Sequence, residues 1–124
     1  MNMKKNKVKL VLKVESTTEI ERLISIINIG ICVAIDNQVL STQEAEDYLY
    51  SPYTMARLQE LGVSQELIDT VHFGTELENV ERLIPEKFSE SLEEIKIEAL
   101  KVLKSLPPTN FPRNRWIERE CDHS

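Results

Sequence analysis

The sequence predicts a mainly α-helical fold, a compact multi-helix bundle around a central hydrophobic helix with one short N-terminal β-strand. The 124 residues include only three glycines and five prolines, too few for the many tight turns of an all-β protein. Serine residues that favour helix starts recur ahead of stretches with apolar residues three or four apart. A chain of this length buries about two-thirds of its unfolded surface, so a single core suffices.

The strand is expected at residues 8–14, where every second residue is valine or leucine. This period of two, with β-branched residues, is typical of a strand. A lone strand leaves its backbone groups unpaired, so this one needs a partner. The alternatives are a second copy of the chain in a homodimer, residues 38–40, and the tail near residues 115–117.

The hydrophobic helix is expected to begin after Ser16 and to run to about Ile35. Ser16 and Glu19 have the spacing of a capping box, in which the two side chains satisfy free N–H groups of the first turn. Because its sequence is apolar on nearly all sides, we interpret it as a buried core helix. Gly30 costs about 1 kcal/mol relative to alanine inside a helix, so we expect it to allow close approach of a neighbouring helix.

Five further helices are expected from the pattern of caps and breakers. Ser41 and Thr75 each stand three residues before a glutamate, which again is the spacing of a capping box. Proline follows Ser51 at the first helical position, where a missing N–H is tolerated. Gly62 and Gly74 are expected to end helices. The predicted segments are residues 41–50, 51–61, 64–74, 75–84 and 89–106.

The predicted organisation is one helical domain over residues 1–106, including the strand, and a C-terminal extended arm over residues 107–124. Two consecutive prolines end the last helix, and no sustained hydrophobic period follows them. Phe111 and Trp116 are the candidate anchors of the arm on the body.

The charge is divided unevenly along the chain, whose formal net charge is −6. Residues 1–13 carry five lysines and no acidic residue, whereas residues 14–106 carry seven lysines or arginines against eighteen acidic residues. An acidic body repels phosphate groups, so we expect no nucleic-acid partner, whereas a basic protein partner is favoured. Solubility is the alternative explanation for the acidic surface.

A cytoplasmic protein without a membrane partner is expected. Lysines among the first thirteen residues interrupt what would be the apolar region of a signal peptide, and no small-residue cleavage site follows. The apolar stretch from Leu23 to Ile35 is shorter than the roughly twenty residues of a membrane span. Cys32 lies in an apolar run and Cys121 in a polar tail, a poor disulfide pair, and reduced thiols suit the cytosol.

No catalytic residues, metal site or cofactor are predicted. His72 has Glu76 and Glu78 nearby in the sequence, but a zinc site needs three or four ligands at short spacing. The sequence also has no nucleophile elbow and no glycine-rich phosphate loop. These observations favour a protein without enzymatic activity. The alternative is a small enzyme or ligand-binding domain centred on His72, which requires His72, Glu76 and Glu78 to converge on one pocket.

Three tyrosines, Tyr48, Tyr50 and Tyr53, form with Met55 the candidate interaction cluster. Tyrosine joins an apolar ring to a polar tip and is enriched at protein interfaces. The alternative is that one or two of these side chains pack into the core at the joint between two predicted helices.

Several strings resemble a family of small bacterial proteins of unknown function. The most specific are Ser-Pro-Tyr-Thr at residues 51–54 and His-x-Gly-Thr-Glu-Leu-Glu at residues 72–78. The resemblance covers roughly residues 8–106 and implies a bacterial, single-domain, cytoplasmic protein, with no activity or site residues to transfer.

The functional hypothesis from the sequence is a non-enzymatic protein–protein interaction module. It depends on the acidic helical body, the missing site chemistry and the tyrosine cluster. A specific version is an immunity-like or regulatory protein that covers a basic partner. A homodimer through the strand at residues 8–14 is a further expectation.

Overall fold

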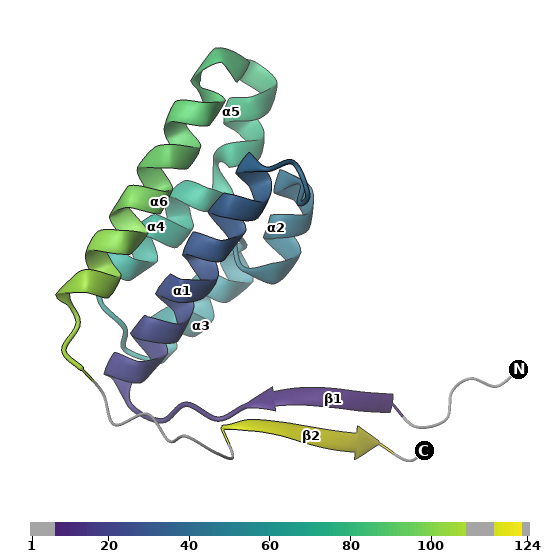
Figure 1. Ribbon diagram of the computed structural model, residues 1–124, viewed down its shortest axis with the longest axis vertical. Coiled ribbons are helices and arrows are strands. Elements are labelled where there is room, and N and C mark those ends of the chain that lie inside the picture. Colours follow the sequence, from purple (N-terminus) through teal and green to yellow (C-terminus); the bar gives the residue numbers. More distant parts are fainter. Residues whose placement is uncertain (1–6, 109–115, 123–124) are drawn as a thin grey trace, which may run out of the picture.

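Six α-helices and a two-stranded β-ribbon make up residues 7–108 and 116–122, which this computed structural model describes (Figure 1). In chain order the elements are β1 (Lys7–Leu12), α1 (Thr17–Asp36), α2 (Thr42–Tyr48), α3 (Pro52–Glu60), α4 (Gln65–Thr75), α5 (Leu77–Leu83), the 3₁₀ turn η1 (Pro85–Lys87), α6 (Phe88–Ser105) and β2 (Ile117–Asp122). The helices form a bundle, and the ribbon extends from the end at which α1 begins (Figure 1). The predicted fold class, mainly α-helical with a short N-terminal strand, is confirmed.

Four of the predicted helix starts are confirmed by side-chain caps. Ser16, Ser41, Ser51 and Ser64 each accept a hydrogen bond from the backbone N–H three residues later, at 3.0–3.3 Å. At Ser41 the capping box is complete, because Glu44 Oε1 accepts from the Ser41 N–H at 2.9 Å. All four serines have extended backbone, with ψ between 151° and 162°, which turns the hydroxyl toward the free N–H groups of the first turn.

Two predicted starts, at Thr75 and Ser89, are wrong. Thr75 is the last residue of α4, and its hydroxyl donates to the His72 carbonyl at 2.6 Å. Glu76 and Lys87, which precede α5 and α6, have ψ of −5° and 0° and make no side-chain cap. An N-cap side chain reaches the free N–H groups of the first turn only from a residue with extended backbone. At both points the backbone stays close to helical, so no side-chain cap forms.

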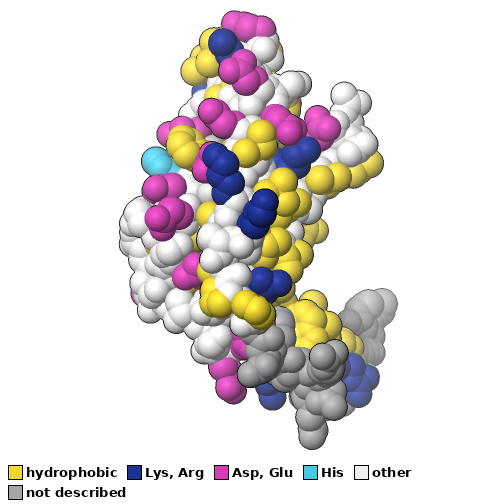
Figure 2. All heavy atoms as spheres, turned by 60° about the vertical axis from the view of Figure 1, so that its left-hand side comes forward, with side chains coloured by type: hydrophobic (Ala, Val, Ile, Leu, Met, Phe, Trp, Pro, Cys, Tyr) yellow, Lys and Arg dark blue, Asp and Glu magenta, His cyan; other side chains and the backbone are white. Residues whose placement is uncertain are grey.

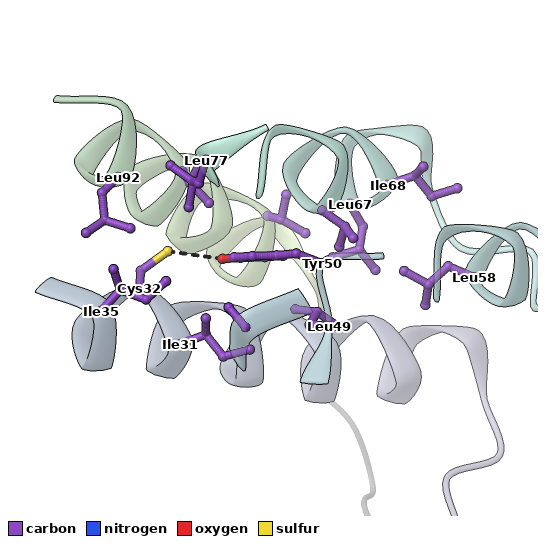
Figure 3. Close-up of a cluster of buried hydrophobic side chains, with 14 of the residues drawn as sticks. Ile31, Cys32, Ile35, Leu49, Tyr50, Leu58, Leu67, Ile68, Leu77 and Leu92 are labelled. Atoms are coloured by element: carbon purple, nitrogen blue, oxygen red, sulfur yellow. Dashed lines mark hydrogen bonds between the residues drawn. The ribbon is translucent and has the colours of Figure 1, made fainter. Parts of the chain in front are cut away.

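The core lies between α1 and the helices that face it. α1 and α6 pack along each other, and α4 and α5 pack against α6. Figure 3 shows hydrophobic side chains from these elements and from α3 meeting around the ring of Tyr50. The largest fully buried apolar side chains are Leu58, Leu67, Val71 and Leu77.

Only one side of α1 contributes to this core, although the sequence is apolar on nearly all sides. Ile31 and Ile35 are buried, whereas Ile26 and Val33 are 51% and 45% exposed. A Cβ on Gly30 would meet no described atom within 4 Å. The close neighbouring helix expected at Gly30 is therefore not supplied by the described residues.

The N-terminal strand pairs with the C-terminal tail, one of the three partners that the sequence left open. β1 runs antiparallel to β2, with Lys7 opposite Asp122 and Leu12 opposite Ile117. β1 ends at Leu12, short of the predicted residue 14, although the Lys13 N–H still donates to the Trp116 carbonyl at 2.8 Å. Of the two candidate anchors of the tail, Trp116 thus contacts Lys13 through its backbone, whereas Phe111 lies outside the described residues.

The two faces of the ribbon differ in polarity. Val8 and Leu10 lie on one face and are 61% and 71% exposed. On the other face Lys9 stands opposite Glu120, a charge-complementary cross-strand pair. The ribbon is thus an amphipathic extension of the bundle that keeps its apolar face open to solvent.

Candidate functional site

A groove of about 840 Å³ runs between α6 and the pair α4–α5, and the start of α1 reaches one end of it. Its walls combine two kinds of side chain. The acidic residues that line it are Glu21, Glu66, Asp69, Glu76, Glu94 and Glu98. The apolar residues that line it are Phe73, Leu77, Val80, Ile95, Val102 and Leu106. Concave sites of this size are the first place to look for ligand or partner binding.

The periodicity of α6 places both kinds of side chain in the groove. Glu94 and Glu98 are four residues apart and form an acidic row, because residues at this spacing share a helix face. Ile95 and Val102 lie toward the core from this row and are buried. Because these two rows lie side by side on α6, this one helix provides both the acidic rim of the groove and the apolar floor below it.

α4 supplies the opposite wall. Its first turn begins at Ser64, whose backbone N–H donates to Glu21 Oε2 of α1 at 3.0 Å. This bond holds the nearly buried Glu21 carboxylate at the N-terminus of α4, where negative charge is favoured. Further along α4, Phe73 is 54% exposed, so a large apolar ring is open to a partner in the groove.

The groove is strongly acidic. Lys101 is the only cation among the described residues that line it, and its Nζ lies 3.3 Å from Glu98 Oε2. Lys101 therefore neutralises one carboxylate at most. A positively charged ligand is favoured here, and an anionic one is repelled.

The predicted tyrosine cluster does not form a single surface. Tyr50 is 1% exposed and belongs to the core, whereas Tyr48 and Tyr53 are 70% and 69% exposed. The guanidinium of Arg57 stacks over the Tyr53 ring at 4.8 Å from its centroid. Met55 is half-buried and packs against the core. The cluster is thus divided between core and surface, and none of the four lines the groove.

The histidine group is only partly brought together. His72 Nε2 lies 3.7 Å from Glu76 Oε2, and both side chains are 56% exposed. This contact forms because α4 continues through Gly74, which the sequence analysis expected to end the helix. Glu78 lies instead near Glu46, whose carboxyl has a pKa raised by desolvation and by the neighbouring negative charge of Glu78.

Of His72, Glu76 and Glu78, only Glu76 lines the groove. An exposed imidazole and carboxylate lack the desolvation by which active sites tune acid–base groups. Within the described residues, no group of three or more His, Cys, Asp or Glu side chains is arranged to hold a metal ion.

A buried polar network was missed by the sequence analysis. The Tyr50 hydroxyl donates to Asn28 Oδ1 at 2.5 Å, and Asn28 Nδ2 donates to Thr70 Oγ1 at 3.1 Å. The Thr70 hydroxyl in turn donates to the Leu67 carbonyl at 2.6 Å. The sulfur of Cys32 lies 3.4 Å from the Tyr50 oxygen (Figure 3).

This network links α1, the α2–α3 joint and α4 inside the core, and we assign it a structural role. Burial raises the pKa values of the Tyr50 phenol and the Cys32 thiol, so both stay protonated at neutral pH. The signal in the sequence was the amide of Asn28 within the mainly apolar stretch from Leu23 to Ile35.

The fold and the site define a small helical domain with an acidic, apolar-floored groove and a two-stranded ribbon. The chain belongs to the family described as "Protein of unknown function (DUF3969)", whose family model matches residues 15–118. The expected membership of a family of unknown function is thereby confirmed. No curated protein matches the chain, and no solved structure does. No helix of the described residues combines the length and hydrophobicity that crossing a membrane requires.

Proposed function

We propose that the protein is a non-enzymatic interaction module whose groove binds a basic, amphipathic helical segment of a partner protein. The observation that carries this proposal is the combination of an acidic rim and an apolar floor in one groove. An amphipathic helix offers apolar anchors three or four residues apart and leaves its polar face outward. Lysine or arginine side chains beside the anchors reach the carboxylates of the rim.

The length of the groove suits such a helix. From Ile95 to Leu106 the apolar floor follows α6 for about 16 Å, given a rise of 1.5 Å per residue. This corresponds to about three turns of a partner helix, enough for anchors at positions i, i+4 and i+7. Phe73, half exposed on the opposite wall, is the aromatic contact that we expect to contribute most to affinity.

A specific version of the proposal is that the module neutralises a basic protein, as an immunity-like or regulatory protein does, by covering its basic surface. The excess of acidic residues over residues 14–106 supports a basic partner over a nucleic acid, whose phosphates the rim repels. We also propose that the protein acts in a bacterial cytoplasm, where the buried thiol of Cys32 stays reduced.

The test is a titration with a fluorescent amphipathic peptide in which lysines flank leucines at helical spacing, and with a peptide in which glutamates replace the lysines. We expect the basic peptide alone to bind, with an affinity that falls as salt is added, because screening weakens the contacts to the rim. Failure of the basic peptide to bind at low salt, or equal binding of both peptides, contradicts the proposal.

A matched pair of variants locates the binding. Glu94→Lys inverts a rim charge, and we expect it to weaken binding by about tenfold, or about 1.4 kcal/mol. Glu86→Lys makes the same change at an exposed position of η1 outside the groove, and we expect a much smaller effect. Phe73→Ala, which removes the aromatic contact without changing the charge, should also weaken binding. Equal losses in Glu94→Lys and Glu86→Lys would indicate non-specific charge attraction.

A further inference from the structure

The outer face of α1 carries apolar residues where a surface helix normally carries polar ones. We define this face by Arg22, Ile26, Gly30, Val33 and Asp36, which follow one another at intervals of three or four and so lie on the side away from the core. Ile26 and Val33 are about half exposed, and Gly30 between them is also exposed.

The apolar surface continues onto α6. Ile97 and Leu100 are 42% and 45% exposed, and α6 packs along α1. Figure 2 shows hydrophobic side chains gathered along one edge of the bundle and continuing toward the ribbon, separate from most acidic groups of that view. Large apolar patches of this kind on soluble proteins mark contact surfaces.

Gly30 makes the middle of the outer face unusually flat. A Cβ placed there would meet no described atom within 4 Å, so packing against the described residues does not require glycine at this position. Glycine inside a helix lowers its stability relative to alanine. What its missing side chain does provide is access for a second helix close to the backbone of α1.

The charges at the two ends of the outer face complement each other. Arg22 lies near the N-terminal end of α1 and Asp36 at its C-terminal end, and neither forms an ion pair with another described residue. In an antiparallel pair of α1 helices that cross at Gly30, Arg22 of one copy comes within about one helical turn of Asp36 of the other. The twofold axis repeats this contact, so the face is complementary to itself.

We infer that the outer face of α1 binds a second copy of the chain, with the two α1 helices antiparallel and Gly30 at the twofold axis. Ile26 of each copy then packs between Gly30 and the C-terminal half of α1 of the other copy, and Arg22 pairs with Asp36 at both ends. This interface leaves the groove between α4–α5 and α6 free, because none of its five residues lines that groove.

The sequence suggested a different homodimer, in which the β1 strands of two copies pair along their edges. Electrostatics makes that dimer less favourable than one through the outer face of α1. β1 is already paired along one edge with β2. With Val11 of β1 at a twofold axis, Lys9 of one copy stands opposite Lys13 of the other. With Lys9 at the axis, it stands opposite itself. Like charges directly opposite one another destabilise strand pairing, so the α1 face is the stronger candidate.

The first experiment measures oligomeric state by sedimentation equilibrium from about 1 to about 200 μM, a range that covers weak dimers. We expect wild type to dimerise, and Ile26→Glu or Val33→Glu to raise the dissociation constant at least tenfold. Leu83→Glu, at a 65% exposed position of α5, is the matched control and should leave the dimer intact. A wild-type monomer across the range overturns the proposal, as does a dimer that survives Ile26→Glu.

The second experiment tests the position of the twofold axis. In a Cys121→Ser background, where Cys32 of the core is the only other thiol, Gly30→Cys places a cysteine at the axis and should form an intermolecular disulfide under mild oxidation. Gln59→Cys, exposed on α3, should not. Equal cross-linking of both variants overturns the inference. A monomer that instead binds anionic lipid vesicles through Ile26 and Val33 would assign the face to a membrane surface and also overturn it.

Discussion

The two sides of α1 do not divide into an apolar and a polar face as in the usual amphipathic helix, because polar residues are buried beside Ile31 and Ile35 and apolar residues are exposed on the outside. The inner side buries polar residues, with Ser25, Asn28 and Cys32 at most 1% exposed. The outer side exposes Ile26 and Val33 to about half of their area. In a surface helix the apolar stripe normally faces the core. Hydrophobicity alone therefore does not orient this helix. Hydrogen bonds fix its inner side, and the dimer proposed above would cover its outer side.

The inner side of α1 favours one arrangement of the helices, because the side-chain amide of Asn28 both accepts and donates a hydrogen bond. Asn28 accepts from Tyr50 and donates to Thr70, so one residue joins segments that are distant in sequence. Buried polar groups that are satisfied in this way stabilise one arrangement of the helices over its alternatives. Of the described side chains, Ser25 alone has a buried polar atom without a hydrogen-bond partner.

The largest effect should follow from breaking this network. Asn28→Ala leaves the buried hydroxyls of Tyr50 and Thr70 without their Asn28 partner and opens a cavity, so we expect a loss of about 3 kcal/mol in the free energy of unfolding. Ile26→Ala, on the exposed side of the same helix, should cost less than about 1 kcal/mol. Urea denaturation followed by circular dichroism measures both. Similar losses in the two variants would remove the distinction between inner and outer sides.

The two helical glycines, Gly30 and Gly74, differ in what surrounds them. A Cβ on Gly74 would come within 2.3 Å of the Tyr50 ring, whereas one on Gly30 meets no described atom within 4 Å. We expect Gly74→Ala to lower the free energy of unfolding by about 2 kcal/mol, because the buried ring must shift. Gly30→Ala should raise it by about 0.5–1 kcal/mol. The measurement is made at low protein concentration, where the proposed dimer is dissociated, and two changes of the same sign would contradict it.

The smallest effect concerns alkaline pH. Burial raises the pKa of the Cys32 thiol above its usual value of 9.0 and that of the Tyr50 phenol above 10.0. Both groups keep their protons in the folded protein after the unfolded chain has released them. This contribution to stability is complete below about pH 9 and is lost as the pH rises toward the raised pKa values.

A pair of tyrosine variants separates this contribution from general alkaline effects. Tyr50→Phe removes the buried phenol and should flatten the fall in stability between about pH 9 and about pH 10.5. Tyr53→Phe changes a tyrosine that is 69% exposed and should leave the wild-type slope. Identical slopes in the two variants would show that Tyr50 does not titrate differently in the folded protein.

The sequence predicted those parts of the fold that depend on local contacts. The caps at Ser16, Ser41, Ser51 and Ser64 were predictable because each bond joins residues three apart. The orientation of α1 was not, because the partners of Asn28 come from the α2–α3 joint and from α4. The partner of β1 also remained open among three alternatives, because β2 is distant from it in the sequence.

The candidate groove was predictable in its charge but not in its shape. The acidic excess over residues 14–106 indicated a basic partner. The rim itself forms only when α4 and α6 lie side by side, which no local pattern specifies. The tyrosine cluster was misleading because closeness in sequence does not ensure a shared surface. Tyr50 turns into the core at the joint, whereas Tyr48 ends α2 on the outside.

The ribbon also has a kinetic consequence. Pairing β1 with β2 closes a loop of roughly a hundred residues, which lowers the entropy of the chain. The hydrogen bonds of two short strands do not offset this loss on their own. The bundle lowers this cost because α1 begins and α6 ends at the same end of the molecule (Figure 1). The ribbon should therefore form late in folding and open first in the native state. Its amides should exchange with solvent deuterium long before those of α1 and α6.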